Sequence, residues 1–406
     1  MKKSPLEGVR VVSFVWQAAG PLASRMLAHH GAEVILVESS TRISGLRITQ
    51  PITMGKTGRN ASGYFNNINT GMLGISLNMA LPKAREIARQ LIAKSDVVIN
   101  NFSKHAMQSW GLAYEDIIEF KPDIIMACLT VMGHSGPRSN VSGHGPSIQA
   151  ASGLNHMTGF PHRPPVGLGT AYVDFGVNCY HAATAILSAL HYRNRTGKGQ
   201  FIDMSQYEST ISTTAVAILD YTANGRVWTR QGNRSSCAAP HGVFRCQGDD
   251  RWCAIAVFTD EEWQALRRVM GDERLACDEH FASLPDRLEN VEELEKLVEA
   301  WTQERPAEEA MRLLQEAGVP AGVVQNSEDL LTRDPQMNAR GHYWTLEHPE
   351  MGQVICDGPA FRLSKTPGEV ARPSPLLGQY NEYVCRQVLG MSEEETAQCA
   401  AAGVFD

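Results

Sequence analysis

Two stretches decide the fold of this 406-residue chain: Val9-Arg10-Val11-Val12-Ser13-Phe14-Val15 and Gly31-Ala32-Glu33-Val34-Ile35-Leu36-Val37-Glu38. Each contains a short run of mostly β-branched apolar residues, which is typical of a strand buried on both faces of a sheet. Between the two runs, the segment that begins at Gly20 carries Leu22 and Met26 at helical spacing. A strand, a helix and a second strand in this order predict parallel strands joined by a right-handed crossover.

The same alternation continues through the first half of the chain. Three further apolar runs have the length of buried strands, at 97–99, 124–129 and 201–204. Three further stretches have helical periodicity, at 82–94, 175–195 and 208–224. We therefore predict an α/β fold in which a large Rossmann-like domain with a parallel sheet covers residues 1–225.

The pattern changes near residue 232, where the alternation of strands and helices stops. Gly248-Asp249-Asp250 lies between two apolar runs, which is a hairpin signal. Three helical patterns follow within residues 261–317. We predict a smaller α+β domain over residues 226–330 and a C-terminal segment, 331–406, that returns to the large domain.

Composition limits the classes of function that the chain can have. The formal net charge is -7 and no stripe of Lys and Arg stands out, which argues against nucleic acid as a partner. Nine cysteines are scattered without a C-x-x-C spacing, which argues against a disulfide framework and a zinc site. No apolar stretch reaches the roughly 18 residues that span a bilayer. We expect a cytoplasmic protein that binds neither a membrane nor a metal.

Asp174 precedes the helical pattern at 175–195 and has two interpretations. As a helix N-cap, its carboxylate would only satisfy free backbone N–H groups, which is the commonest use of Asp at this position. As a functional group, it would be kept ionised by the helix N-terminus and could act as a nucleophile. Gly176, two residues later, would let a bulky thioester approach the backbone. The pattern alone leaves both interpretations open.

Other polar residues lie in loops or at a strand end. His144, between two glycines, could act as a general base or be a solvated surface group. Glu38 ends the second strand, where nucleotide-binding folds place an acid for a ribose, although an ordinary strand end explains it equally well. The small residues of 235–242 suit either a lid or a linker.

Short motifs follow one another over nearly the full length of the chain. They are Leu6-Glu7-Gly8-Val9-Arg10-Val11, Ala19-Gly20-Pro21, Gly31-Ala32-Glu33-Val34, Asp96-Val97-Val98-Ile99-Asn100-Asn101-Phe102, Trp110-Gly111-Leu112, Gln149-Ala150-Ala151-Ser152-Gly153, Asp174-Phe175-Gly176, Thr196-Gly197-Lys198-Gly199-Gln200, Gly318-Val319-Pro320, Asp334-Pro335 and Pro375-Leu376-Leu377-Gly378. In this order the motifs resemble the class III CoA-transferase family, which includes formyl-CoA transferase and carnitine CoA-transferase.

The resemblance implies an enzyme that takes an acyl-CoA and a carboxylic acid as substrates, with no tightly bound cofactor. It implies that Asp174 attacks the donor thioester to form a mixed anhydride. The released CoA then gives an aspartyl-CoA thioester, from which CoA passes to the acceptor acid. Such a route divides one difficult exchange into activated steps. The family further implies a dimer of two interlocked rings, which would be a homodimer or a heteromer with a paralogue.

The family motifs also assign site residues. Gln17, His144 and Gly176 fall at positions that line the active site. Asn101 and Phe102 match positions that contact CoA, and Lys104 would replace a family Arg as a phosphate partner, as a point charge without the bidentate fork.

The chain departs from the family pattern in four places. They are Ser103-Lys104-His105 in place of R-P-G, Met72 in place of a basic residue, Gly145 in place of Asp after His144, and residues 235–242 in place of a glycine-run lid. These changes point away from formate and oxalate as substrates. By family analogy we expect a donor such as succinyl-CoA and a larger acceptor, such as a carnitine-like, aromatic or dicarboxylic acid.

Two alternatives stay open. An α-methylacyl-CoA racemase would use His144 and Asp174 as two bases. However, Gly145 breaks the racemase pattern, Gln149-Ala150 favours a transferase, and Thr259 occupies the position of a racemase Glu. The other alternative is a non-catalytic subunit of a heteromeric CoA-transferase, against which the presence of Asp174 argues.

Overall fold

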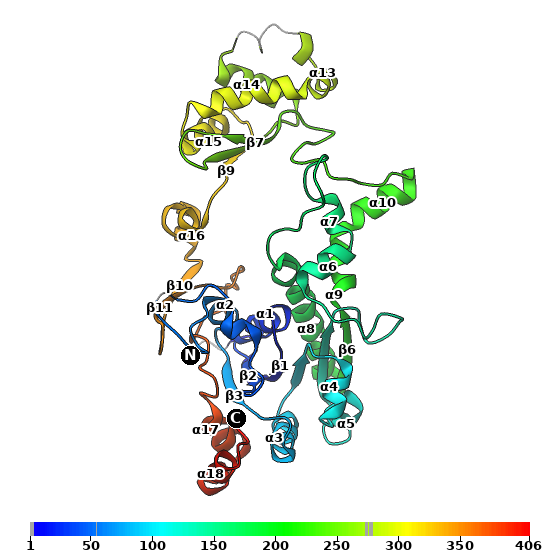
Figure 1. Ribbon diagram of the computed structural model, residues 1–406, viewed down its shortest axis with the longest axis vertical. Coiled ribbons are helices and arrows are strands. Elements are labelled where there is room, and N and C mark those ends of the chain that lie inside the picture. Colours follow the sequence, from blue (N-terminus) through cyan, green and yellow to red (C-terminus); the bar gives the residue numbers. More distant parts are fainter. Residues whose placement is uncertain (1–3, 54, 273–274, 276–278) are drawn as a thin grey trace. The chain divides into compact units, whose positions relative to one another are not determined.

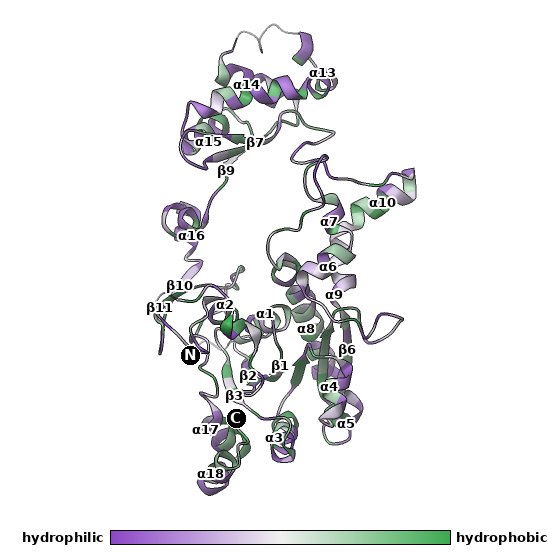
Figure 2. Cartoon of the chain, viewed as in Figure 1, coloured by the Kyte–Doolittle hydropathy of each residue, from purple (hydrophilic) through white to green (hydrophobic). Residues whose placement is uncertain are grey.

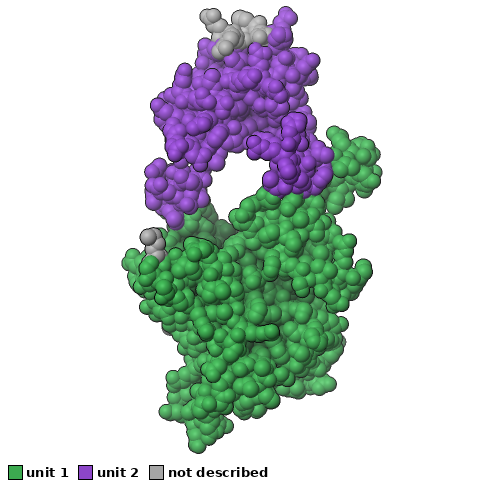
Figure 3. Space-filling view, viewed as in Figure 1, with its two compact units in different colours: residues 1–155, 167–227, 337–406 green, residues 156–166, 228–336 purple. Residues whose placement is uncertain are grey.

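The computed structural model describes residues 4–53, 55–272, 275 and 279–406. It contains two compact units, which are coloured separately in Figure 3. The first unit comprises residues 1–155, 167–227 and 337–406, and the second unit comprises residues 156–166 and 228–336. The predicted domain boundaries at residues 225 and 330 stay a prediction.

A six-stranded sheet forms the centre of the first unit (Figure 1). Its strands lie in the order β3-β2-β1-β4-β5-β6, and every neighbouring pair is parallel. Their bounds are β1 Arg10–Phe14, β2 Glu33–Glu38, β3 Leu73–Ser76, β4 Val97–Asn100, β5 Ile125–Thr130 and β6 Gln200–Ser205. The predicted α/β fold with a parallel sheet is thus confirmed.

Alternate residues of the central strands enter two separate hydrophobic clusters, one on each face of the sheet. Val11 belongs to the cluster that includes residues of α1 (Ala19–His29) and α8 (Cys179–Thr196). Its neighbour Val12 belongs to the cluster that includes residues of α3 (Pro82–Ala93). Burial of both faces explains why the strands are continuous apolar runs in the sequence, and Figure 2 shows the central strands as hydrophobic.

The remaining elements of the first unit are short. Its helices are α2 Gly63–Ile68, α4 Lys104–Ser109, α5 Tyr114–Ile118, α6 Gly145–Ala151, α9 Gln206–Ile211, α10 Ala215–Asn224, α17 Asn381–Tyr383 and α18 Glu393–Ala401. A separate antiparallel pair consists of β10 Tyr343–His348 and β11 Gly352–Asp357. Helices α7 Leu154–Met157 and α16 Pro335–Arg340 lie where the chain passes between the two units.

Two predicted helices differ from the structure. The stretch 208–224 forms α9 and α10 with a 3-10 turn at Ser212–Thr214 between them. The hydroxyl groups of Ser212, Thr213 and Thr214 each donate to a carbonyl three residues earlier, which competes with a regular helix. The other predicted helix, 175–195, begins with a π-helical turn at Asp174–Asn178, so that α8 starts only at Cys179.

The second unit has its own antiparallel sheet and its own core. Its strands are β7 His241–Arg245, β8 Trp252–Ala256 and β9 Ala321–Val323, in the order β7-β8-β9. Its helices are α11 Asp260–Met270, α13 Leu284–Glu289, α14 Val291–Gln303 and α15 Ala307–Glu316. The predicted hairpin around residues 248–250 is confirmed by the pairing of β7 with β8.

Three further facts bear on function. The eight described cysteines are all free, and Cys277 lies outside the described residues. No group of three or more His, Cys, Asp and Glu residues in the described part of the chain could hold a metal ion. Among the same residues, no helix combines the length and the apolar character that a membrane crossing requires.

Candidate functional site

A cavity of about 470 Å³ lies at the carboxyl ends of the first four strands of the parallel sheet. The strand order reverses between β1 and β4, and open α/β sheets bind ligands in the crevice at such a switch point. The cavity is therefore the place in the first unit where the fold itself predicts a ligand.

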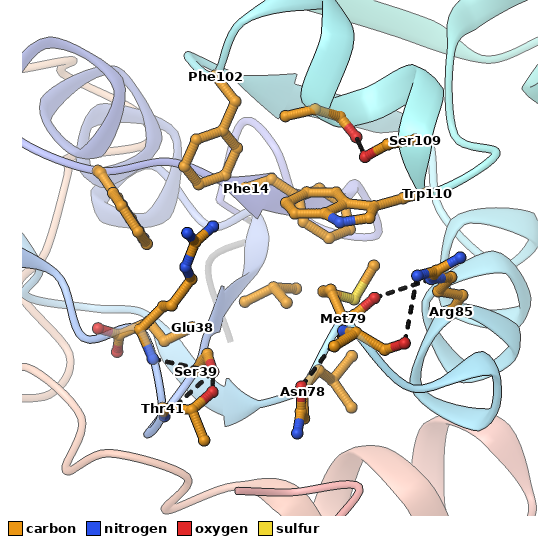
Figure 4. Close-up of a pocket in the computed structure, with 16 residues that line it drawn as sticks. Phe14, Glu38, Ser39, Thr41, Asn78, Met79, Arg85, Phe102, Ser109 and Trp110 are labelled. Carbon is orange, nitrogen blue, oxygen red and sulfur yellow. Dashed lines mark hydrogen bonds between the residues drawn. The ribbon is translucent and has the colours of Figure 1, made fainter.

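One wall of this cavity is aromatic, as Figure 4 shows for Phe14, Phe102 and Trp110. The ring of Phe102 meets Trp110 edge to face at 5.7 Å between centroids and meets Trp16 in the same way at 5.1 Å. Aromatic rings of this kind offer a flat apolar surface for a planar group such as a nucleotide base.

The rest of the cavity wall carries polar groups. Ser39, Thr41, Asn78 and two arginines, Arg42 and Arg85, lie along it. The Arg85 guanidinium donates to the carbonyls of Met79 and Ala80 at 2.8 and 3.2 Å, which holds its charge at the cavity. Arginine is well suited to phosphate recognition. Together the two walls suit a ligand with a heterocycle and phosphate groups.

Phe102 and Asn101, the predicted CoA contacts, have different environments. Phe102 lines the cavity, whereas Asn101 is used by the protein itself. The Asn101 side chain accepts a hydrogen bond from the Trp16 N–H at 2.9 Å and donates to the Trp16 carbonyl at 2.6 Å. A Cβ atom at Gly20 would lie 3.2 Å from the Asn101 amide nitrogen and 2.7 Å from Val15, which explains the glycine at this position. Asn101 therefore positions the aromatic wall.

Gln17 and Lys104 lie near the same strand ends. Gln17 has a φ of 60°, a left-handed conformation that is uncommon for a residue with a side chain. Such conformations are enriched at functional sites. Lys104 is exposed at the start of α4 and is not one of the residues that line the cavity.

Glu38 reaches the cavity, but its carboxylate is already bound. Arg47 donates to both carboxylate oxygens, at 2.8 and 2.6 Å, and neither side chain is more than 1% exposed. The ordinary interpretation of Glu38 as a strand end is therefore closer to the structure than the interpretation as a ribose-binding acid.

Asp174 lies inside a helical turn and does not cap it. The π-helical turn at Asp174–Asn178 has Val173 at its N-cap and no capping side chain. The Asp174 carboxylate accepts a hydrogen bond from Asn178 Nδ2 at 3.1 Å on Oδ1 and another from the backbone N–H of Gly145. The interpretation as an N-cap is wrong, because the carboxylate accepts from the side-chain amide of Asn178 and from the N–H of Gly145, and neither is a free backbone N–H group at the start of its own helix.

Burial dominates the electrostatics of Asp174. The residue is 6% exposed, and desolvation raises its pKa above the ordinary value, while Asn178, His144 and Gly145 act in the opposite direction. Burial thus opposes the ionisation that a helix N-terminus is expected to favour. The carboxylate is poorly solvated, and a poorly solvated carboxylate is a more reactive nucleophile when it is ionised.

The start of α6 explains the departure from the family pattern at Gly145. The Ser147 hydroxyl accepts from the His144 N–H at 2.9 Å, which starts the helix beside Asp174. A Cβ atom at position 145 would lie only 2.6 Å from Asp174 Oδ2. Glycine is thus the residue that lets the backbone N–H of this position reach the carboxylate.

Exposed groups surround the buried carboxylate. His144 and Gly176 are exposed, and Tyr172 is 49% exposed. Tyr172 also packs beside Gly176, where an added Cβ atom would lie 3.6 Å from its ring. Asp174 is therefore a buried carboxylate with exposed residues close to it.

Two neighbours of Asp174 were not found from the sequence. Tyr64 stacks on Phe175 at 5.9 Å between centroids, and burial, together with the charge of Asp174, raises its pKa. No local pattern marks Tyr64, because it lies far from Asp174 in the chain. Asn178 is fully buried, and its position four residues after Asp174, on the same side of a helix, is a signal that could have revealed it.

Comparison with known proteins gives a consistent result. The model of a family described as CoA-transferase family III matches residues 6–381. The chain is 31% identical over 405 residues to the succinyl-CoA--D-citramalate CoA-transferase of Chloroflexus aurantiacus, which covers 99% of this chain and 98% of that protein. It is also 31% identical to the alpha subunit of a succinyl-CoA--L-malate CoA-transferase of the same organism, over 96% of this chain and 90% of that subunit.

A solved structure agrees with the sequence comparisons. A CAIB/BAIF family protein from Brucella suis is similar with a TM-score of 0.87 and 31% identity, over 95% of this chain and all of that one. The similarity extends over nearly the whole chain, as the order of the sequence motifs predicts.

Proposed function

The chain belongs to CoA-transferase family III and is an enzyme of that class, and from this premise we propose that Asp174 carries CoA covalently between two acids. The donor would be succinyl-CoA and the acceptor a dicarboxylic acid. Both relatives described above are named for a succinyl-CoA donor, and citramalate and malate are dicarboxylic acids. These names support the proposed substrates and do not choose between acceptors.

The proposed reaction has four steps. The ionised Asp174 carboxylate attacks the thioester carbonyl, the C–S bond breaks, and a mixed anhydride forms as CoA thiolate leaves. The thiolate then attacks the aspartyl carbonyl and releases the donor acid as its carboxylate. The acceptor carboxylate attacks the resulting aspartyl-CoA thioester, the C–S bond breaks, and a second mixed anhydride forms as CoA thiolate leaves. The thiolate finally attacks the acceptor carbonyl of this anhydride, and Asp174 leaves as its carboxylate. The steps move acyl groups between oxygen and sulfur without any change of oxidation state.

The surroundings of Asp174 carry this proposal. Burial of the carboxylate keeps it poorly hydrated, and Asn178 and Gly145 bind it by neutral hydrogen bonds. A low content of water also protects an anhydride from hydrolysis. Exposed Gly176 has no side chain to obstruct a thioester, and the backbone near it could stabilise an oxyanion.

The cavity at the switch point would hold the nucleotide end of CoA. Its aromatic wall suits the adenine, and Arg42 and Arg85 suit the phosphate groups. Gln17 lies in the turn between β1 and α1. Trp16 in the same turn is hydrogen-bonded to Asn101, so that the nucleotide end and the acyl end of the substrate would meet around this turn. His144 would face the acceptor from its exposed position.

Chemical trapping of the activated Asp174 tests the mechanism. The enzyme is mixed with succinyl-CoA and hydroxylamine, and the peptide that contains Asp174 is examined by mass spectrometry. We expect a hydroxamate at Asp174 in the wild-type protein and none in the Asp174→Asn variant. Exchange of the α-proton of an acyl-CoA without movement of CoA would contradict the proposal and favour a racemase.

Activity that appears only after a paralogous chain is added would show a heteromer, whereas a dimer active alone would show a homodimer.

A further inference from the structure

Asn178 is the polar neighbour of Asp174 that is buried completely, with 0% exposure. Its Nδ2 group donates to Asp174 Oδ1 at 3.1 Å and to Gln206 Oε1 at 3.2 Å. Its own Oδ1 accepts from the Ser209 hydroxyl. Because three partners bind the two ends of this amide, only one orientation of the amide satisfies all of them.

The partners of Asn178 are themselves anchored to the sheet. Gln206 Nε2 donates to the carbonyl of Leu129 in β5 at 2.8 Å, which turns the Gln206 carbonyl oxygen toward Asn178. The Ser209 hydroxyl also lies 3.0 Å from the backbone carbonyl oxygen of Gln206, within α9. Gln206 and Ser209 are only 7% and 8% exposed. The donor that faces Asp174 is therefore fixed by packed protein and does not need to reorganise during a reaction.

The two oxygens of Asp174 face different surroundings. Oδ1 faces the buried amide of Asn178, whereas Oδ2 faces Gly145, at the start of α6 and next to exposed His144. Because Asn178 is fully buried, Oδ1 would stay on the protein side and remain the carbonyl oxygen after acylation of Oδ2.

We propose that Asn178 is a catalytic residue that stabilises the oxyanion formed on Asp174 Oδ1 when CoA attacks the acylated aspartate. This inference rests on the proposed function. In that step the thiolate sulfur bonds to Asp174 Cγ, and the electron pair of the Cγ=Oδ1 bond moves onto Oδ1. The Cγ=Oδ1 bond then forms again, the Cγ–Oδ2 bond breaks, and the donor acid leaves with Oδ2 as a carboxylate. No proton is transferred.

The geometry fits this role. Donors of oxyanion holes lie 2.7–3.1 Å from the position of the oxyanion, and Asn178 Nδ2 lies 3.1 Å from Oδ1 before any charge has moved there. A neutral amide can serve both the free carboxylate and the oxyanion, whereas a Lys or Arg would hold the free carboxylate in an ion pair and weaken it as a nucleophile. Gln206 and Ser209 would act through Asn178 as positioning residues.

The rate of covalent CoA attachment tests the proposal. The enzyme is mixed rapidly with succinyl-CoA in the absence of an acceptor, and the protein that carries CoA on Asp174 is measured by mass spectrometry over time. We expect Asn178→Ala and Asn178→Leu to slow this attachment on the order of 10²-fold, with unchanged affinity for CoA. Ser209→Ala leaves the Asn178 amide in place and should slow the attachment of CoA less than the Asn178 variants do.

Asn69→Ala is the matched control. Asn69 is 1% exposed and donates to the Phe65 carbonyl at 2.9 Å, so that its loss also removes a buried amide from the first unit. Asn69→Ala should leave the rate of attachment unchanged. Normal attachment in folded Asn178→Ala or Asn178→Leu would overturn the inference. If both Asn178 variants fail to fold, a normal rate of attachment in Ser209→Ala would overturn the inference. Absence of attachment in the wild-type protein would instead contradict the proposed function itself.

Discussion

Glu38 and Asp174 are both buried carboxylates of the first unit, with 4% and 6% exposure, but their partners are opposite in kind. Glu38 is held by the guanidinium of Arg47, which also lies over the ring of Phe65 at 3.7 Å. Asp174 is held by a neutral side-chain amide and a backbone N–H group, and none of the ion pairs among the described residues includes it.

The difference shows how one unit can give two buried acids separate tasks. A buried charge must be paired or its pKa must shift. Pairing fixes Glu38 as part of the framework around the cavity, where its negative charge is balanced before any ligand binds. Asp174 is left with a raised pKa, and its lone pairs are available for a bond to carbon. The following predictions test this contrast.

The largest effect should follow from replacement of Asp174. Asp174→Ala and Asp174→Asn should lower kcat/KM by at least about 10⁴-fold, because the group that would form the covalent bond is removed. The binding of CoA, measured by titration, should change little, since the cavity belongs to other residues. Residual activity within tenfold of the wild-type value would remove Asp174 from the mechanism.

The raised pKa of Asp174 predicts that the stability of the protein depends on pH. The raised pKa of Asp174 means that the folded state holds this proton more tightly than the unfolded state, so that stability falls as pH rises from the ordinary value of 3.8 through the folded value. Asp174→Asn lacks this loss. We expect the difference in unfolding free energy between the variant and the wild type to move in favour of the variant as pH rises through this window. A difference that stays constant with pH would contradict the assigned burial.

Arg47 should give the largest loss of stability. Arg47→Met leaves Glu38 buried without its cation, which should lower the free energy of unfolding by about 3–5 kcal/mol. The double variant Glu38→Gln/Arg47→Met should recover most of this loss, because both charges are then absent. Chemical denaturation measures both values. Equal losses in the single and double variants would show that the ion pair is not the cause.

Gly145→Ala should displace the Asp174 carboxylate. The new Cβ atom would lie 2.6 Å from Oδ2, and a shift of about 1 Å in a reacting group can reduce a rate about 10²-fold. Gly74→Ala in β3 is a control from the same unit, because its Cβ atom would crowd the Pro375 side chain at 2.9 Å and not Asp174. Steady-state kinetics should show a loss of kcat only at position 145. Equal losses at both positions would point to a general disturbance of the unit.

Trp110→Ala should weaken the binding of acyl-CoA about tenfold, because one ring of the aromatic wall is lost. Trp110→Phe should retain most of the affinity, since a ring remains. The dissociation constant of CoA, measured by calorimetry, checks both variants. An unchanged constant in Trp110→Ala would mean that CoA binds elsewhere.

The smallest effect is expected at Lys104. Lys104→Gln removes an exposed charge outside the wall of the cavity, so that the KM for acyl-CoA should rise only about two- to threefold at low salt. The difference should disappear at high ionic strength, because screening weakens an exposed charge. A large effect that persists in salt would show direct phosphate binding by Lys104.

Much of the fold could be predicted from local sequence. The apolar runs at 97–99 and 124–129 coincide with β4 and β5, because strands buried on both faces need apolar side chains throughout. The run at 201–204 coincides with β6, a partly exposed strand at the edge of the sheet. Ser392 and Glu395 form a capping box at the start of α18, and such a box depends only on residues three positions apart. The departures, at 175–178 and 212–214, occur where hydrogen bonds to side chains or a wider turn interrupt the regular helix.

The sequence by itself determined the order of the strands and helices, the family and the identity of Asp174 as the candidate nucleophile, since these depend on neighbouring residues and on motifs. Only the tertiary structure decided what surrounds each acid. Gly145, Gln206 and Ser209 lie between 28 and 35 positions from Asp174 or Asn178, and they meet only because α6, α9 and the π-helical turn pack together. Desolvation and hydrogen bonding depend on that packing, which no local pattern of residues reports.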